Sequence, residues 1–224
     1  MNTSADTALD VGLAEMGLAL PSPARQKLAA YLDLLAKWNG TFNLTAIRDR
    51  DQMVSHHLLD SLSVARFIQA GGLLDVGSGG GLPGIVLAIW GEACLPDLRV
   101  TVLDSNHKKA AFLRQAQIEL KLANLDVCGE RVEAWQPPQR FAQIISRAFS
   151  DLYEFFHLTR HLATTPQDKM VNEGARWLAM KGVHPHEEIQ QLPPDCQLEQ
   201  VHRLKIPGLN AERHLVVLRA VDGH

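Results

Sequence analysis

Apolar residues recur with helical spacing through the first 70 residues of the chain. The first stripe falls at positions i, i+3, i+4 and i+7 and consists of Leu28, Tyr31, Leu32 and Leu35. It predicts a helix that begins at Ser22-Pro23 and ends at Asn39-Gly40. A second stripe, which predicts a helix from about Asp51 to Gly71-Gly72, consists of Val54, Leu58, Leu62 and Ala65. We therefore expect a helical N-terminal segment over residues 1–70, with an irregular connector at residues 41–47.

From residue 73 onward, short apolar runs alternate with helical patterns. The predicted strands are Leu73–Val76, Leu98–Leu103, Leu125–Cys128, Phe141–Ser146, Trp177–Met180, Gln197–Lys205 and His214–Ala220. One predicted helix begins at Gly84, and two more are predicted at Lys108–Leu122 and Leu152–Leu162. The buried side of the middle helix is expected to carry Ala111, Phe112, Gln115, Ile118 and Leu122. This alternation predicts an α/β domain over residues 71–224. Its sheet is expected to have seven mostly parallel strands with an antiparallel edge strand. In such sheets ligands bind beyond the carboxyl ends of the strands.

Composition narrows the class of protein further. The chain has 224 residues, 46% of them hydrophobic, and a formal net charge of −3. It contains three scattered cysteines and no basic start typical of a signal peptide. No apolar run reaches the length of a membrane span. We therefore expect a cytoplasmic protein without a membrane anchor, a disulfide framework or a metal site.

The stretch Asp75–Gly84 carries the most information about a ligand. It places a glycine-packed turn between a buried strand and a helix, so bare backbone and a helix N-terminus can approach the ligand. The glycines fit two patterns. One starts at Gly79 and matches a dinucleotide site, and the other starts at Asp75 and Gly77 and matches a site for S-adenosylmethionine.

The second pattern is favoured for three reasons. Gly77 directly follows the predicted strand, whereas Gly79 does not. The acidic residue expected for a dinucleotide falls at Asp97, in a loop before a strand, whereas Asp104 ends the second strand. An acidic Asp75 beside the turn suits a sulfonium cation better than a pyrophosphate. A nicotinamide dehydrogenase and a non-catalytic cofactor-binding module remain alternatives.

The preferred ligand gives individual residues a chemical role. Gly77 lets the backbone approach the methionine part of the cofactor, and Leu82 offers an apolar contact. Asp104 can accept hydrogen bonds from both ribose hydroxyls. The alternative is that Asp104, with Ser105 and Asn106, begins the next helix as its N-cap. The backbone N–H of Val132 or Glu133 can serve the adenine ring.

Two motifs that the chain lacks indicate which atom accepts the methyl group. The place of the proline-proline-aromatic loop that serves exocyclic amines holds Ser146–Phe149 instead. No cysteine is placed to act as the nucleophile that methylation of a pyrimidine carbon needs. Guanine N7 is already nucleophilic, so it needs no catalytic base. We therefore expect direct in-line methyl transfer by positioning, without a covalent intermediate, and with Arg147 near the cofactor or the base.

Ten blocks of sequence, in order from residue 43 to residue 215, carry a family resemblance. They are Asn43–Ile47, His57–Ser61, Asp75–Gly84, Leu103–Ser105, Lys108-Lys109, Phe112–Gln115, Arg131–Glu133, Ser146–Phe149, Lys181-Gly182 and Glu212–Leu215. With them the chain resembles the bacterial glucose-inhibited division protein B family, the small-subunit ribosomal RNA guanine-N7 methyltransferases. One departure is the stretch Trp90–Asp97, which looks longer than usual.

The resemblance implies a class I, Rossmann-like methyltransferase fold and S-adenosylmethionine as the cofactor. It also implies that the target is one guanine in the 530-loop region of 16S rRNA. The residues that it assigns to the cofactor are Gly77, Leu82, Val132, Glu133 and Arg147, with Asp104 at the acidic strand end. The expected partner is 16S rRNA or the small ribosomal subunit, including an assembly intermediate, and the protein is expected to be a monomer.

Overall fold

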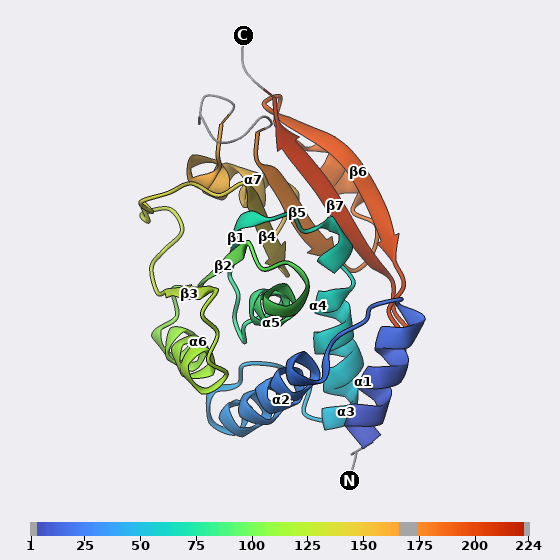
Figure 1. The fold of residues 1–224 in the computed structure, drawn as a ribbon. Coiled ribbons are helices and arrows are strands. Elements are labelled where there is room, and N and C mark those ends of the chain that lie inside the picture. Colours follow the sequence, from blue (N-terminus) through green and yellow to red (C-terminus); the bar gives the residue numbers. More distant parts are fainter. Residues whose placement is uncertain (1–3, 166–173, 222–224) are drawn as a thin grey trace.

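A seven-stranded sheet forms the centre of the computed structural model, which describes residues 4–165 and 174–221 (Figure 1). The strands follow the order β3-β2-β1-β4-β5-β7-β6. Their bounds are β1 Gly71–Val76, β2 Leu98–Leu103, β3 Leu125–Cys128, β4 Gln143–Arg147, β5 Arg176–Lys181, β6 Cys196–Leu204 and β7 Arg213–Ala220. The seven predicted strands are therefore confirmed, with ends that move by at most two residues.

The pairing directions confirm the predicted sheet. Strands β1 to β5 run parallel to one another, and β7 is antiparallel to both of its neighbours, β5 and β6. The antiparallel strand thus lies between β5 and the edge strand β6. The strand order reverses between β1 and β4, and the carboxyl ends of these two strands mark the switch point at which such sheets bind ligands.

Helices cover both faces of the sheet. On one face α5 (Gly84–Cys94) packs against β2, α6 (His107–Glu119) against β3, and both contact α2. On the other face α7 (Leu152–Thr159) contacts β5 and α8 (His186–Gln190). Figure 1 shows the N-terminal helices gathered alongside α5. Each face therefore has its own hydrophobic cluster.

The N-terminal segment is helical, as predicted. It contains α1 (Ser4–Glu15), α2 (Ser22–Phe42), α3 (Arg50–Met53), a π-helix (Val54–Leu59), α4 (Asp60–Leu62) and a 3-10 helix (Ala65–Phe67). Its buried residues join the same hydrophobic cluster as β1, β2 and α5. One continuous core therefore holds this segment against the sheet, and burial of the predicted stripes stabilises the contact.

Two predicted helix ends are wrong. Helix α2 continues through Asn39-Gly40 to Phe42 and ends at Asn43, which has a left-handed backbone with φ of 50°. The Asn39 side chain is buried and accepts a hydrogen bond from the Thr45 N–H, so it serves the packing rather than the helix end. Gly71 and Gly72 begin β1 instead of ending a helix.

The predicted buried side of α6 is also wrong in part. The buried residues are Ala110, Phe112, Leu113 and Ala116, whereas Ile118 is 68% exposed. The ring centroids of Phe112 and of Trp38 in α2 lie 5.6 Å apart, so the contact with α2 turns this face of α6 inward. The long stretch after Trp90 is mostly helix, because α5 extends to Cys94.

Two helical glycines should respond oppositely to alanine. At Gly84 a Cβ would lie 2.4 Å from Val102 Cγ1 and 2.7 Å from Asp75 Oδ2, whereas at Gly40 it would meet nothing within 4 Å. We expect Gly84→Ala to lower the free energy of unfolding by about 1–3 kcal/mol through overpacking. Gly40→Ala should raise it by about 0.5–1 kcal/mol through reduced backbone entropy. Denaturant unfolding measures both, and a Gly84→Ala variant as stable as the original would contradict the close packing of α5 on β2.

Candidate functional site

The glycines in the turn between β1 and α5 have two different roles. Gly77, Gly79 and Gly81 all have left-handed backbone, with φ of 69°, 60° and 87°. A Cβ at Gly81 would lie 2.4 Å from Ile85 Cδ1, so that glycine serves internal packing. A Cβ at Gly77 would meet nothing within 4 Å. Gly77 therefore borders open space at the carboxyl end of β1, where the sequence predicts the cofactor.

Asp75 stabilises this turn from inside the protein. Its side chain is fully buried, and its Oδ2 accepts hydrogen bonds from Ser78 Oγ at 2.5 Å and from the Gly84 N–H at 2.8 Å. Burial raises the pKa of Asp75 to about 6, although these two hydrogen bonds and the charge of Arg147 oppose that rise. Asp75 therefore fixes the start of α5, and the turn rather than its carboxylate faces the open space.

Asp104 connects β2 to the same turn. Its Oδ2 accepts a hydrogen bond from the Gly79 N–H at 2.9 Å, and its Oδ1 accepts one from the Asn106 N–H at 2.9 Å. The N-cap of α6 is Asn106, so the alternative that Asp104 caps this helix is wrong. A carboxylate has about four acceptor positions, so Asp104 can accept further hydrogen bonds from hydroxyl groups.

Val132 and Glu133 follow β3 in a single tight turn. The N–H groups of Ala134 and Trp135 both donate to the Arg131 carbonyl at 3.1 Å. Val132 is buried in the hydrophobic cluster that also holds Leu103, the neighbour of Asp104, whereas Glu133 is exposed. Within the part of the chain that the structure describes, the N–H groups of Val132 and Glu133 have no hydrogen-bond partner. They remain donors for a ligand at the end of β3.

Leu82 is the least accessible of the predicted cofactor residues. Its side chain is 4% exposed and packs in the main core beside the glycine turn. It can therefore present only a small apolar surface to a ligand.

Arg147 lies at the end of β4, where it meets the N-terminal segment. Its Nη1 donates to the His56 carbonyl at 3.0 Å and to Asp60 Oδ2 at 3.1 Å. The other oxygen of Asp60 accepts a hydrogen bond from Arg213 Nε at 3.1 Å. Asp60 is 1% exposed, so this carboxylate is a buried counterion for two guanidinium groups.

Neither Asp60 nor Arg213 is among the residues predicted to line the site. Both lie in blocks that carry the family resemblance, His57–Ser61 and Glu212–Leu215, and this is the signal that could have identified them. The π-helix Val54–Leu59 ends directly before Asp60. Such wide helical turns occur often at functional sites.

Two further residues of the N-terminal segment support the site. The Tyr31 hydroxyl donates to the Gly80 carbonyl at 2.5 Å, and burial raises the pKa of this phenol, so it stays a donor. His57 Nε2 lies 2.9 Å from Thr45 Oγ1. Burial, followed by the charge of Arg147, lowers the pKa of His57 to about 4, so its imidazole is neutral near pH 7. The helical segment thus forms one wall of the candidate site.

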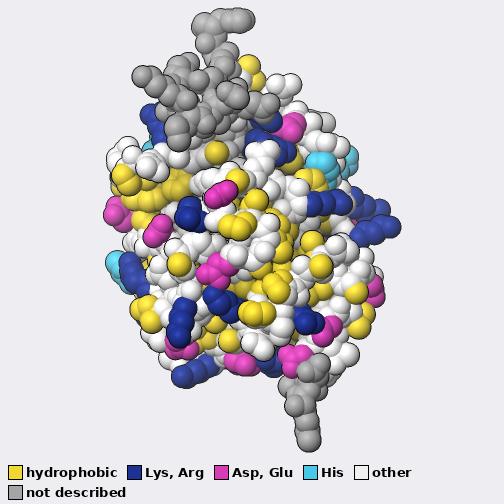
Figure 2. Space-filling view, viewed as in Figure 1, with side chains coloured by type: hydrophobic (Ala, Val, Ile, Leu, Met, Phe, Trp, Pro, Cys, Tyr) yellow, Lys and Arg dark blue, Asp and Glu magenta, His cyan; other side chains and the backbone are white. Residues whose placement is uncertain are grey.

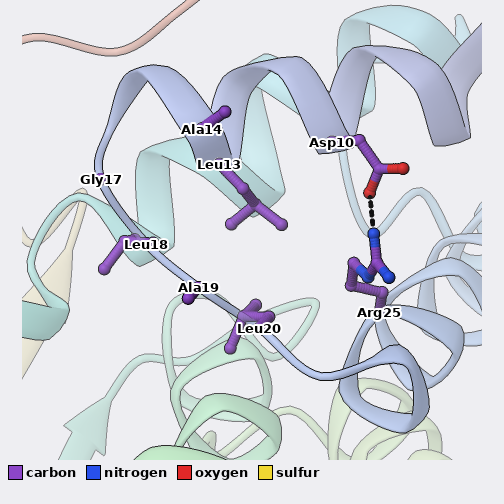
Figure 3. Close-up of a pocket in the computed structure, with 8 residues that line it drawn as sticks. All are labelled: Asp10, Leu13, Ala14, Gly17, Leu18, Ala19, Leu20 and Arg25. Carbon is purple, nitrogen blue, oxygen red and sulfur yellow. Dashed lines mark hydrogen bonds and ion pairs between the residues drawn. The ribbon is translucent and has the colours of Figure 1, made fainter.

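Other features of the structure lie apart from these residues. A cavity of about 440 Å³ borders the Asp10–Arg25 ion pair between α1 and α2, and none of the predicted site residues lines it (Figure 3). Figure 2 shows cationic and acidic side chains interspersed over one face of the molecule. None of the helices in the described ranges has both the length and the apolar character needed to cross a membrane. Among the same residues no group of three or more His, Cys, Asp or Glu side chains could hold a metal ion.

Comparison with known proteins places the chain in a family. A family model described as "GidB: rRNA small subunit methyltransferase G" matches residues 24–216. The chain belongs to this family. Ribosomal RNA small subunit methyltransferase G of Laribacter hongkongensis is 53% identical over 210 residues, which cover 94% of this chain and 96% of the relative. The protein of the same name from Chromobacterium violaceum is 53% identical over 209 residues, which cover 93% and 94%.

Solved structures of other methyltransferases share the fold of this family member. The O-methyltransferase TomG from Streptomyces achromogenes, in complex with SAM, aligns with a TM-score of 0.56 and 16% identity over 99% of this chain and 100% of its own. An O-methyltransferase from Bacillus cereus, in complex with SAH, aligns with a TM-score of 0.55 and 15% identity over 96% and 99%. The fold is therefore the class I, Rossmann-like methyltransferase fold that the resemblance implied.

Proposed function

We propose that this chain transfers the methyl group of S-adenosylmethionine to N7 of one guanine in 16S rRNA. The observation that carries the proposal is membership of the small-subunit rRNA methyltransferase G family over residues 24–216. The 530-loop region of the rRNA is the target that follows from this family. The site at the carboxyl ends of the strands supplies the matching chemistry.

The residues around this site fit S-adenosylmethionine. The open space beside Gly77 leaves room for the methionine part next to bare backbone. Asp104, which already accepts from the Gly79 N–H, has acceptor positions left for the two ribose hydroxyls. The N–H groups of Val132 and Glu133 can bind the adenine ring, and Leu82 adds an apolar contact.

Arg147 completes the proposed cofactor site. Two hydrogen bonds from its Nη1 fix the guanidinium in place, and its other N–H groups can bind the carboxylate of the cofactor. When it is bound, S-adenosylmethionine supplies an electrophilic methyl group on a sulfonium. The protein supplies no catalytic base, because guanine N7 carries a lone pair and no proton. Its residues orient the guanine in line with the methyl group, and this positioning supplies the rate enhancement.

The form of the RNA follows from its geometry. In an A-form helix N7 lies in a deep, narrow groove that protein side chains cannot read. The target guanine therefore lies in a loop or is turned out of its stack. We infer that the protein acts as a monomer in the cytoplasm, on 16S rRNA or on the small ribosomal subunit, including an assembly intermediate.

Methyl transfer to defined RNA tests this proposal. The protein is incubated with labelled S-adenosylmethionine and with naked 16S rRNA, mature small subunits or a partly assembled subunit. We expect label on one guanine, detected by strand cleavage at N7-methylguanine. The matched control is a 16S rRNA with 7-deazaguanine at the mapped position, which should accept no label. Absence of label from all three substrates would overturn the proposal, and a titration that showed affinity for NAD and none for S-adenosylmethionine would favour the dehydrogenase alternative.

A further inference from the structure

Asp60 holds two arginines at the carboxyl end of the sheet, and the proposed function uses only one of them. Arg147 and Arg213 contact the two separate oxygens of this carboxylate, each at 3.1 Å. The Asp60 side chain is 2% exposed, whereas the side chains of Arg147 and Arg213 are 25% and 26% exposed. The counterion is therefore internal to the protein, and both cations reach solvent.

The negative charges near this cluster are unequally divided between its two arginines. Both guanidiniums share the Asp60 carboxylate, but Arg147 also interacts with the charge of Asp75. His57 adds no positive charge, because burial lowers its pKa to about 4. The neighbouring Lys181 is already paired with Glu188 at 2.7 Å. Arg147 has the carboxylate of the proposed cofactor as a further anionic partner, whereas Arg213 has only a share of the Asp60 carboxylate among the described residues, so Arg213 favours a second anionic ligand.

Arg213 also has hydrogen-bonding capacity to spare. Its Nε donates to Asp60 and its Nη1 donates to the Glu212 carbonyl at 2.8 Å. Its Nη2 has no hydrogen-bond partner among residues 4–165 and 174–221, and it is not among the buried unpartnered atoms. This nitrogen is therefore accessible and can donate to an anion from outside the protein.

The strand order indicates which anion this is. The proposed cofactor residues follow β1, β2 and β3, which form one half of the sheet, and Arg147 ends β4 at the switch point. Arg213 begins β7, which is separated from β4 by β5. Arg213 therefore lies on the side of Arg147 that faces away from the cofactor residues. An RNA that approaches on this side can reach Arg213 without displacing the cofactor from its proposed residues.

We propose that Arg213 binds a backbone phosphate of the acceptor RNA next to the target guanine, and that Asp60 is the positioning residue that holds Arg213 and Arg147 at a fixed spacing. The planar guanidinium suits a phosphate because it can donate two parallel hydrogen bonds. This inference rests on the proposed function, since it names a contact to the RNA that the protein methylates.

The test measures RNA and cofactor binding separately. In steady-state methyl transfer, Arg213→Gln should raise the KM for the RNA about tenfold, the loss expected for one charged hydrogen bond. The dissociation constant for S-adenosylmethionine should stay within about twofold, because Arg213 lies outside the cofactor half of the sheet. The slope of log kcat/KM against log salt should become shallower by about one, because one phosphate contact is lost. Arg213→Lys keeps the charge and should retain the original slope.

A matched control separates this contact from general charge effects. Arg203 lies on β6 across from His214, is exposed, and forms an ion pair with Glu212 at 3.7 Å. Arg203→Gln therefore removes an arginine from the same edge of the sheet. The inference is overturned if Arg213→Gln shows the RNA KM and salt slope of Arg203→Gln, or if its losses for cofactor and RNA are equal. Asp60 keeps Arg147 as a partner in Arg213→Gln, so the variant should fold. If it does not, Arg213→Met, which keeps an aliphatic chain, gives the same measurement.

The result is also distinct from a failure of the proposed function. The unmodified protein is assayed first, on the same RNA. If it transfers no methyl group, both the proposed function and this inference are contradicted. If it is active and Arg213→Gln is indistinguishable from it, only this inference fails.

Discussion

Replacement of Gly77 by valine should weaken binding of S-adenosylmethionine about 100-fold or more, a loss of about 2.7 kcal/mol. The backbone at Gly77 has φ of 69°, and the space in front of its Cα is open. A valine side chain would fill the space that we assign to the methionine part of the cofactor. An equilibrium titration with the cofactor measures the effect, and methyl transfer should fall in parallel.

Gly17 provides the matched control for this change. Its φ is 66°, and a Cβ there would also meet nothing within 4 Å, but Gly17 follows α1 and lies outside the candidate site. Valine should impose a similar backbone strain of about 1–3 kcal/mol at both positions. Gly17→Val should therefore lose stability and keep its affinity for the cofactor. If Gly77→Val binds the cofactor as tightly as Gly17→Val does, the cofactor does not occupy the space beside Gly77.

The dependence of stability on pH should reveal two buried groups that oppose each other. Burial lowers the pKa of His57 from 6.5 in the unfolded chain to about 4 in the folded protein. Between these two pH values the unfolded chain binds a proton that the folded chain does not. This contribution to stability is lost as the pH falls. Burial raises the pKa of Asp75 from 3.8 to about 6, so the folded chain keeps a proton that the unfolded chain releases. That contribution is lost as the pH rises.

Between pH 4 and 6 the two effects act in opposite directions, and each amounts to about 3 kcal/mol. Relative to the unmodified protein, His57→Gln should lose stability by about this amount as the pH rises through this range, and Asp75→Asn should gain it. Denaturant unfolding at several pH values measures the slopes. The double variant should run parallel to the unmodified protein, and single variants that also run parallel to it would show that neither group has a shifted pKa.

Local sequence patterns predicted the order of the elements well. The strands were predictable because each is a short apolar run, and the glycine turn was predictable because only glycine adopts these left-handed conformations without strain. The buried side of α6 was not predictable, because its polar and apolar residues mark no single face and its contact with Trp38 decides which face turns inward. The predicted end of α2 was wrong for a different reason, because the buried Asn39 side chain accepts a hydrogen bond from the Thr45 N–H beyond the helix, which an Asn-Gly pair does not by itself indicate.

By itself the sequence determined the alternation of strands and helices, the turn at Gly77 and the acidic end of β2 at Asp104. These features depend on neighbours along the chain, and parallel strands bring their carboxyl ends to one edge. Only the tertiary structure decided that Asp75 is an internal anchor and that Asp60 joins Arg147 and Arg213. Asp60 lies 87 and 153 positions from these arginines, so their meeting depends on how the N-terminal helices pack against the sheet, which no local pattern encodes.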